Sequence, residues 1–226
     1  MKNLKDNLKD ILDLNNLELD QEKIDLITEY VKLLLEHNKF INLISRKDEN
    51  HILEKHIIPC LVFSTVFQNF DQSVLDIGTG GGLPGIPFSI VNQKSLITLI
   101  DSIRKKVNAV RDIVQKLGLK NVETIWTRAE DKNFIDNYKN RYDLIISRAT
   151  ASLEILIEYS KPLCRNSNSR LAVMKGGDQL EDEIIKAKKR FNYIAIQKKP
   201  LIYLPENPEN INKKFIIIVE RINGRK

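Results

Sequence analysis

Residues 76–85, Asp-Ile-Gly-Thr-Gly-Gly-Gly-Leu-Pro-Gly, bring one acid and five glycines together at the end of a short apolar run. Asp76, Gly78, Gly80 and Gly82 match the pattern Asp-x-Gly-x-Gly-x-Gly. Glycine has no Cβ, so the backbone of this loop can lie directly against a ligand. S-adenosylmethionine (SAM) carries a cationic amino group and a sulfonium. A carboxylate such as that of Asp76 would attract this positively charged methionine part of SAM. The loop therefore predicts a SAM site.

Two other ligands and a packing role compete with this interpretation. Gly80 and Gly85 have the separation of a P-loop, but Ile86 and Pro87 stand where lysine and serine or threonine are required. Residues 80–85 also match the Gly-x-Gly-x-x-Gly of dinucleotide sites. The first glycine of that motif should end the strand, however, and here Gly80 lies two residues beyond Gly78, the glycine that follows the predicted strand. A glycine-rich turn that serves packing alone remains an alternative.

The next apolar run ends in a second acid, Asp101, about twenty residues beyond the glycine loop. A carboxylate at that place can accept hydrogen bonds from both ribose hydroxyls of SAM or of NAD. Asp101 could also cap the helix that follows, and the two roles are compatible. Residues 127–130, Thr-Arg-Ala-Glu, follow the third apolar run, where backbone N–H groups and Glu130 could contact the adenine edge.

Elements that could position these residues begin at residue 73, where short apolar runs alternate with helical patterns. This alternation predicts an α/β fold, a doubly wound sheet with parallel strands and helices on both faces. The last two runs have no helix between them, so the final strand is expected to be antiparallel. The predicted strands are 74–77, 96–100, 122–126, 142–147, 171–174, 193–196 and 215–219, and the predicted helices are 86–91, 105–117, 130–138, 153–163 and 178–191.

The first seventy residues have helical patterns. Asp20 is a candidate N-cap, and apolar residues from Ile24 to Leu35 recur at three- and four-residue steps. A second helical pattern runs from about residue 50 to residue 67, where Pro59 is expected to kink or divide it. The predicted domains are therefore a helical N-terminal cap, residues 1–70, and a cofactor-binding domain, residues 71–226.

Composition narrows the classes of partner and compartment. The 226 residues carry a formal net charge of +6, which favours phosphate-rich partners, although a bias toward lysine, asparagine and isoleucine could also produce it. No apolar run has the ~18–20 residues of a membrane span. Cys60 and Cys164 stand alone, as expected in a reducing cytoplasm. His37, His51 and His56 lack metal-ligand spacing, so no metal is expected.

The run DIGTGGGLPGIP, residues 76–87, resembles the signature of the bacterial small-subunit rRNA guanine-N7 methyltransferases, the RsmG or GidB (glucose-inhibited division protein B) family. The chain departs from the family pattern at His37, Ile44 and Pro59, all in the N-terminal part. Other segments match the family in its order: HNKFINLIS (37–45), EKHIIPCL (54–61), LIDSIRKKVNAVRDIVQKLGLKNVE (99–123), TRAE (127–130), YDLIISRATASL (142–153) and AVMKG (172–176).

This resemblance implies a Rossmann-like SAM-dependent methyltransferase fold, with a mostly parallel seven-stranded sheet, an antiparallel last strand and a small helical N-terminal cap. It implies a guanine in the 530 loop of 16S rRNA, within the free RNA or the small ribosomal subunit, as the target. It also implies SAM contacts at Gly78, Leu83, Asp101, Ala129, Glu130 and Arg148, and RNA contacts at Lys105, Arg128, Arg148 and Lys175.

The residues agree with an N7 acceptor. Guanine N7 has a free lone pair and carries no proton, so no general base is expected, and the Asp/Asn-Pro-Pro-aromatic motif of amino methylation is absent. Cys164 is misplaced for the nucleophile of cytosine-C5 methylation. We expect Arg148 and Lys175 to position the substrate by gripping phosphates or guanine O6. Trp126 is expected in the core or the pocket wall.

Three alternatives remain. They are a small-molecule SAM methyltransferase, a non-catalytic RNA-binding module with a vestigial SAM loop, and a dinucleotide oxidoreductase.

Overall fold

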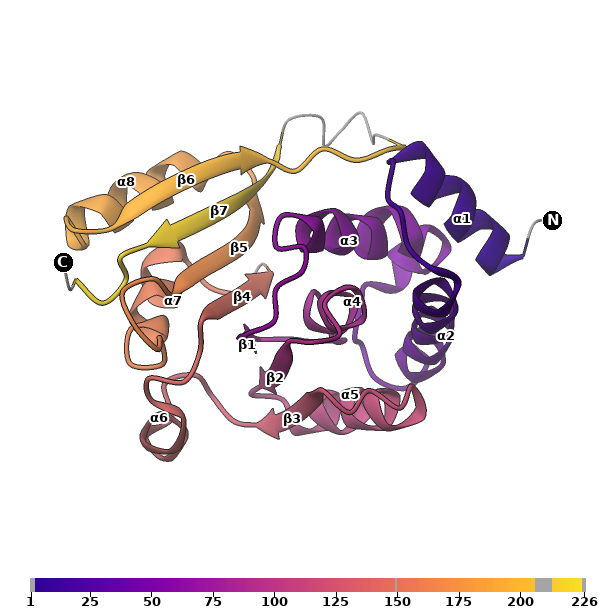
Figure 1. Cartoon of the computed structure of the whole chain (residues 1–226), viewed down its shortest axis with the longest axis horizontal. Helices are drawn as coiled ribbons and strands as arrows, with labels where there is room; N and C mark the ends of the chain where they lie inside the picture. The colour runs from indigo at the N-terminus through magenta and orange to yellow at the C-terminus, as the bar shows by residue number, and fades with distance from the viewer. Residues whose placement is uncertain (1–2, 149, 206–212, 225–226) are drawn as a thin grey trace.

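The computed structural model describes residues 3–148, 150–205 and 213–224. Its centre is a seven-stranded sheet with the strand order β3-β2-β1-β4-β5-β7-β6 (Figure 1). Strands β1 to β5 pair in parallel, and β7 lies antiparallel between β5 and β6. The predicted sheet and its antiparallel last strand are therefore confirmed. Ala149, in the segment 142–153 of the family resemblance, lies outside the described residues, as do residues 206–212 of the last connection.

The strands and the helices between them follow the alternation that the sequence predicts. The strands are β1 Ser73–Ile77, β2 Leu96–Asp101, β3 Val122–Trp126, β4 Leu144–Arg148, β5 Arg170–Gly176, β6 Ala195–Pro200 and β7 Lys214–Glu220. The helices are α4 Gly85–Val91, α5 Arg104–Lys116, α6 Lys132–Tyr138, α7 Leu153–Ser160 and α8 Leu180–Arg190.

The largest error in the predicted strands concerns β6. The sequence pattern predicts this strand at residues 193–196, whereas it runs from Ala195 to Pro200. β6 is the edge strand of the sheet, and Gln197, Lys198 and Lys199 are exposed. Charged residues on an edge strand discourage pairing with another chain, but they also hide the apolar pattern by which a strand is recognised.

The N-terminal part contains α1 Leu4–Leu14, α2 Gln21–Asn38, the 3₁₀ turn η1 Arg46–His51, the π-helical turn η2 Leu53–Ile57 and α3 Ile58–Thr65. The Asp20 side chain caps α2 by accepting a hydrogen bond from the Lys23 N–H at 2.9 Å, as predicted. The helical pattern of residues 50–67 is divided just before Pro59. The proline lies in the first turn of α3, where its missing N–H leaves no helical bond unmade.

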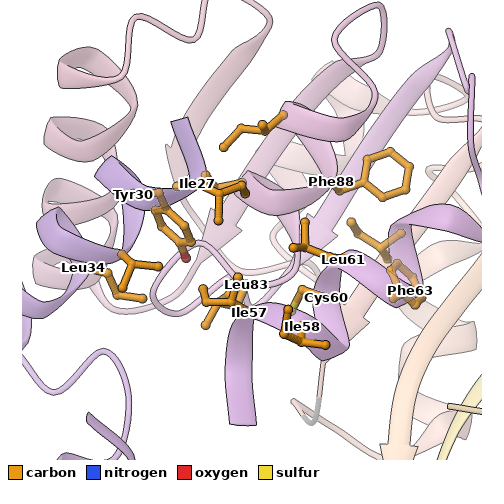
Figure 2. Packing of buried hydrophobic residues seen from close by; sticks show 14 of the residues in the cluster. Ile27, Tyr30, Leu34, Ile57, Ile58, Cys60, Leu61, Phe63, Leu83 and Phe88 are labelled. Carbon is orange, nitrogen blue, oxygen red and sulfur yellow. The ribbon is translucent and has the colours of Figure 1, made fainter. Parts of the chain in front are cut away.

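The N-terminal helices pack on one face of the sheet, together with α4 and α5 (Figure 1). Ile27 and Leu34 of α2 share one buried cluster with Leu61 of α3 and Phe88 of α4 (Figure 2). A second cluster on the opposite face joins the sheet to α6, α7 and α8. The inner strands β1, β2, β4, β5 and β7 are thus buried on both faces over most of their length, whereas the edge strands β3 and β6 are partly exposed. The division into domains at residue 70 stays a prediction.

The helices that the structure describes include none with the length and apolar character needed to cross a membrane.

Candidate active site

The carboxyl ends of β1, β2 and β4, with the chain just beyond β3, surround a cavity of about 510 Å³, which we call the cofactor cavity. Ligands of open α/β sheets bind at this edge because loops there connect strands to helices on opposite faces. The volume falls in the range of small-molecule sites. Six residues proposed from the sequence as cofactor contacts line this cavity: Gly78, Gly80, Asp101, Ala129, Glu130 and Arg148.

The first two glycines of the loop bring bare backbone to the cavity. Gly78 has a φ of 71° and donates its N–H to the Ile100 carbonyl at 2.9 Å. A Cβ at Gly78 would lie 2.3 Å from Thr150 Cγ2, so only glycine fits there. Gly80 has a φ of 58°, and a Cβ at that position would have no close neighbour within the protein. The space beside Gly80 is therefore available to a ligand.

Asp101 ties the glycine loop to the end of β2. Its Oδ2 accepts a hydrogen bond from the Gly80 N–H at 3.0 Å, and its Oδ1 accepts one from the Ile103 N–H at 2.8 Å. Each carboxylate oxygen can accept a further hydrogen bond. Asp101 thus has acceptor capacity for two ribose hydroxyls while it fixes the backbone around them.

The loop after β3 closes the far end of the cofactor cavity. Ala129 is buried and Glu130 is exposed, and both line the cavity. Lys106 of α5 and Tyr159 of α7 also line it, although no sequence motif pointed to them. Burial raises the pKa of the Tyr159 hydroxyl, and the neighbouring Glu130 carboxylate raises it further. Tyr159 is therefore a neutral hydrogen-bonding group.

Asp76, Gly82 and Leu83 do not belong to the lining of the cofactor cavity. Asp76 is fully buried, and its Oδ2 accepts hydrogen bonds from Thr79 Oγ1 at 2.8 Å and from the Gly85 N–H at 3.0 Å. Its Oδ1 is buried without a hydrogen-bond partner in the part of the chain that the structure describes. In this structure Asp76 therefore supports the loop from beneath. Direct cofactor contacts of these three residues stay predictions.

Burial raises the pKa of Asp76 to about 7, against 3.8 for a free side chain. Because the folded state then binds a proton that the unfolded state has released, stability falls as the pH rises from about 4 to about 7. Asp76→Asn removes this titration. The quantity to compare is the unfolding free energy of the variant minus that of the wild type. We expect this difference to grow by about 4 kcal/mol at most as the pH rises from about 4 to about 7.

Denaturant unfolding at a series of pH values checks this prediction. His56 acts in the opposite direction, because its pKa is lowered to about 4 and stability therefore rises with pH between about 4 and 6.5. His56 is present in both proteins, so its effect cancels in the difference. A difference that stays flat across the window would show that Asp76 is ionised in the folded protein at acidic pH.

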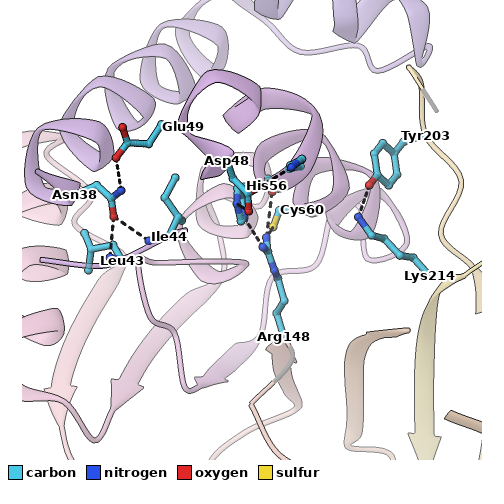
Figure 3. Close-up of polar contacts among 11 residues, drawn as sticks. Asn38, Leu43, Ile44, Asp48, Glu49, His56, Cys60, Arg148, Tyr203 and Lys214 are labelled. Atoms are coloured by element: carbon cyan, nitrogen blue, oxygen red, sulfur yellow. Dashed lines mark hydrogen bonds and ion pairs between the residues drawn. The ribbon is translucent and has the colours of Figure 1, made fainter. Parts of the chain in front are cut away.

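Arg148, at the end of β4, reaches toward the N-terminal helices (Figure 3). Its guanidinium donates to the His56 carbonyl at 3.4 Å, to Cys60 Sγ at 3.6 Å and to His56 Nδ1. His56 Nε2 lies 3.2 Å from Asp48 Oδ2. Because an arginine is always protonated, Nδ1 must accept, and Nε2 carries the proton toward Asp48. Two cap residues thus fix the direction of Arg148.

The remaining basic residues proposed for RNA differ in their surroundings. Lys105 is exposed and lies outside the lining of the cofactor cavity, whereas its neighbour Lys106 belongs to that lining. Arg128 lines that cavity and lies 3.4 Å from Glu130 Oε1. Lys175 pairs with Glu183 Oε2 at 2.6 Å. RNA contacts at these positions stay predictions.

Several other predictions concern residues outside the cofactor cavity. Trp126 is 54% exposed and lies outside the lining of the cofactor cavity, so its expected place in the core or pocket wall is wrong. Instead, Arg104 lies over its ring at 5.1 Å. Cys164 is buried, which raises its pKa to about 12 and makes it a poor nucleophile. The described residues contain no cluster of ligands that could hold a metal ion.

The donor set of the cofactor cavity fits SAM. Bare backbone at Gly78 and Gly80 leaves room for the adenosyl and methionine parts. Asp101 offers two oxygens to a ribose, and the loop after β3 offers polar groups to a base. The doubly wound sheet with an antiparallel seventh strand and this cavity define the class: the chain has the Rossmann-like fold of SAM-dependent methyltransferases.

Solved structures and sequence relatives agree with this class. A SAM-dependent methyltransferase from Aquifex aeolicus superposes with a TM-score of 0.54 at 20% identity, over 83% of this chain and 98% of that one. A fibrillarin from Aeropyrum pernix, solved with bound SAM, superposes with a TM-score of 0.54 at 10% identity, over 72% and 76% of the two chains.

The chain belongs to the GidB family, rRNA small subunit methyltransferase G, whose model matches residues 23–211. A ribosomal RNA small subunit methyltransferase G from Clostridium botulinum is 31% identical over 204 residues, which cover 90% of this chain and 84% of the relative. The enzyme of the same name from Acetivibrio thermocellus is 30% identical over 200 residues, which cover 88% and 81%.

Gly80→Ala is expected to weaken SAM binding at least tenfold, because its methyl group would enter the space beside the loop. Gly118→Ala is the matched control. Its φ of 66° is similar and its Cβ would also meet no neighbour, but it follows α5 away from the cavity. Each variant should lose about 1–2 kcal/mol of stability from the left-handed conformation. Calorimetry with SAM measures the difference, and equal SAM affinities of the two variants would contradict this assignment of the cavity.

Proposed function

We propose that this protein methylates N7 of a guanine in the 530 loop of 16S rRNA with SAM as the methyl donor. The observation that carries the proposal is the cofactor cavity, where six residues proposed from the sequence come together in a chain of the rRNA small subunit methyltransferase G family. The partner is the 16S rRNA, free or in the small ribosomal subunit, and the location is the cytoplasm.

In this proposal Gly78, Gly80 and Asp101 hold SAM together with the backbone around Ala129 and the side chain of Glu130. When bound, SAM would supply a methyl group on a sulfonium, to which an attacking lone pair can bond in line as the neutral thioether leaves. Asp101 orients the ribose, while the bare backbone of the two glycines accepts the chain of the cofactor without steric conflict.

The residues around the cavity support an acceptor that needs no proton removed. Guanine N7 is such an acceptor, since its lone pair is free. The Tyr159 hydroxyl has a raised pKa, and the His56 imidazole is occupied by Arg148 and Asp48, so neither is a ready base. The protein then accelerates the reaction by alignment, which can contribute ~7–11 kcal/mol.

Substrate positioning falls to Arg148 and Lys175, with Lys105 and Arg128 as further RNA contacts. Arg148 must not donate to N7, because it would then occupy the attacking lone pair. Donation to guanine O6 or to a phosphate leaves N7 free. Lys175 would have to share its charge between Glu183 and the RNA.

The test uses small ribosomal subunits from cells that lack the gene, incubated with the protein and SAM. Reduction and aniline treatment cleave RNA at N7-methylguanine, and primer extension maps the break. A single SAM-dependent break in the 530 loop is the expected result. SAM binding without any break would leave the cofactor assignment intact and overturn the choice of acceptor.

The alternative functions have less support. A small-molecule methyltransferase and a vestigial RNA-binding module are both disfavoured by the family match and by the six proposed residues that line the cofactor cavity. A dinucleotide oxidoreductase is disfavoured by the same match.

A further inference from the structure

A second cavity lies beside Arg148, and we call it the cap-side cavity. Its volume is about 270 Å³. Lys55 and Pro59 of the N-terminal helices line one part of it, and Met174 and Lys175 at the end of β5 line another. Arg148 lines both this cavity and the cofactor cavity, so a ligand in either lies next to the same side chain.

Two lysines of the cap-side cavity are balanced by acids. Lys55 Nζ lies 2.6 Å from Asp48 Oδ1, and Lys175 Nζ lies 2.6 Å from Glu183 Oε2. These two pairs hold their side chains in place and leave little net charge. The net charge of the cavity must therefore come from its other cations.

Three cations of the lining remain without an acidic partner among the described residues. Arg148 is bonded to uncharged groups of a histidine and a cysteine. Lys214 Nζ donates to the Tyr203 hydroxyl at 2.6 Å, which is also uncharged (Figure 3). Lys213 is exposed, and the described part of the chain gives it no ion pair. A phosphate group is the anion that most naturally meets such a cluster in an rRNA methyltransferase.

The rest of the cap-side cavity is apolar. Pro59, Met174 and Leu201 are buried side chains that line it. A planar base can lie against such groups, whereas its sugar and phosphates would face the lysines. The cavity is about half as large as the cofactor cavity, a size for one nucleotide rather than a stretch of RNA. Enzymes that modify a base commonly turn it out of the stack into a pocket of this kind.

We propose that the cap-side cavity takes the acceptor nucleotide, a guanosine phosphate unit turned out of the RNA stack. Its base lies against Met174 and Leu201, its phosphates face Lys213 and Lys214, and its Hoogsteen edge faces Arg148. Arg148 then donates to O6, and the adjacent N7 faces the cofactor cavity. This inference rests on the proposed function and adds the place and orientation of its substrate.

The reaction in this arrangement is balanced without a proton transfer. The bond between sulfur and the methyl carbon breaks as the bond between N7 and that carbon forms. The sulfur keeps the electron pair and becomes a neutral thioether, while the positive charge moves to the guanine. The cap fixes Arg148 through His56 and Cys60, which keeps the guanidinium on O6 and off N7.

The first test compares two double variants with the same change in charge. Lys213→Glu with Lys214→Glu alters the cap-side cavity. Lys94→Glu with Lys120→Glu alters exposed lysines just before β2 and β3, at the amino ends of the strands and so away from both cavities. We expect the first pair to raise the KM for 16S rRNA at least tenfold and to leave the Kd for SAM within twofold. The second pair should change the KM less than threefold.

Equal KM changes in the two double variants would overturn the proposal, because they would indicate only the loss of general attraction to RNA. A loss of SAM affinity in the first double variant that is as large as its rise in KM would also overturn the proposal. Thermal unfolding of every variant shows whether the fold is retained. If the wild type itself gives no N7-methylguanine, the proposed function fails, which is a separate result from these two.

A second measurement needs no variant. A 16S rRNA fragment with 6-thioguanosine at the methylated position is irradiated with the wild-type protein saturated with S-adenosylhomocysteine. Because sulfur replaces O6, which faces Arg148 in this arrangement, we expect cross-links in the peptide that contains Arg148 and in those that contain Met174 or Leu201. Cross-links confined to peptides outside the cap-side cavity would place the base elsewhere and overturn the proposal.

Discussion

Asp101→Ala is expected to weaken SAM binding by at least 100-fold. The carboxylate supplies acceptors for two ribose hydroxyls, and hydrogen bonds to a charged group contribute about 1.5–3 kcal/mol each. It also holds the Gly80 N–H and the Ile103 N–H, so its removal loosens the backbone on both sides of the cofactor cavity. Since about 1.4 kcal/mol is tenfold in affinity, the loss of two such bonds accounts for the expected effect. Calorimetry with SAM measures it.

Asp101→Asn serves as the conservative variant. It keeps one oxygen acceptor and nearly the same shape, so we expect a loss of SAM affinity between that of the wild type and that of the alanine variant. Asp112→Ala is a control in α5, the helix that follows Asp101. Asp112 is paired with His37 of α2 and with Lys116 of α5, and it does not line the cofactor cavity. If Asp101→Ala bound SAM as well as Asp112→Ala does, the ribose would not lie at Asp101.

Arg148→Ala should lower the rate of rRNA methylation by about 100-fold or more, with a much smaller effect on SAM affinity. Arg148 is the side chain shared by the two cavities, and its contacts to O6 or phosphate would each contribute about 1.5–3 kcal/mol. The truncation also leaves His56 Nδ1 without its donor, so a loss of stability of about 1–3 kcal/mol is expected. Single-turnover methylation and calorimetry separate the rate from the two affinities.

Arg190→Ala is the matched control, because this arginine is paired with Glu158 on the surface and lines neither cavity. Arg148→Lys keeps the charge but cannot reach His56 and Cys60 with the same fork of donors, so partial activity is expected. An Arg148→Ala protein with normal RNA affinity that had lost only SAM binding would contradict the assignment of Arg148 to the substrate.

The cofactor cavity was largely predictable because its parts are local in the sequence. The glycine loop, Asp101 and residues 127–130 each follow an apolar run, and parallel strands bring all their carboxyl ends to one edge. The ligand contact that the motif predicts for Asp76 stays a prediction, because this residue does not line the cofactor cavity. Its position in the strand turns its side chain beneath the loop, toward Thr79 and Gly85.

The surroundings of Arg148 could not have been predicted from local patterns. His56 has no metal-ligand spacing and Cys60 lies in an apolar helix, so neither residue indicated a role. They meet Arg148 only because the N-terminal helices pack over the end of β4 (Figure 3). Trp126 differs from its prediction for a related reason. An aromatic residue in a strand is usually packed, but Trp126 is the last residue of β3, where its ring is exposed and Arg104 lies over it.

The sequence by itself determined the alternating strands and helices, the kind of cofactor that the glycine loop can accept, and the family. These depend on residue types at short spacing, where backbone periodicity and the absence of a Cβ act directly. The tertiary structure alone decided that Arg148 lies between two cavities and that residues of the N-terminal helices hold it. It also decided that Lys213 and Lys214, near the C-terminus, line the same cavity as Pro59 of α3. Those contacts join residues far apart in the chain, and only the packing of the helices on the sheet brings them together.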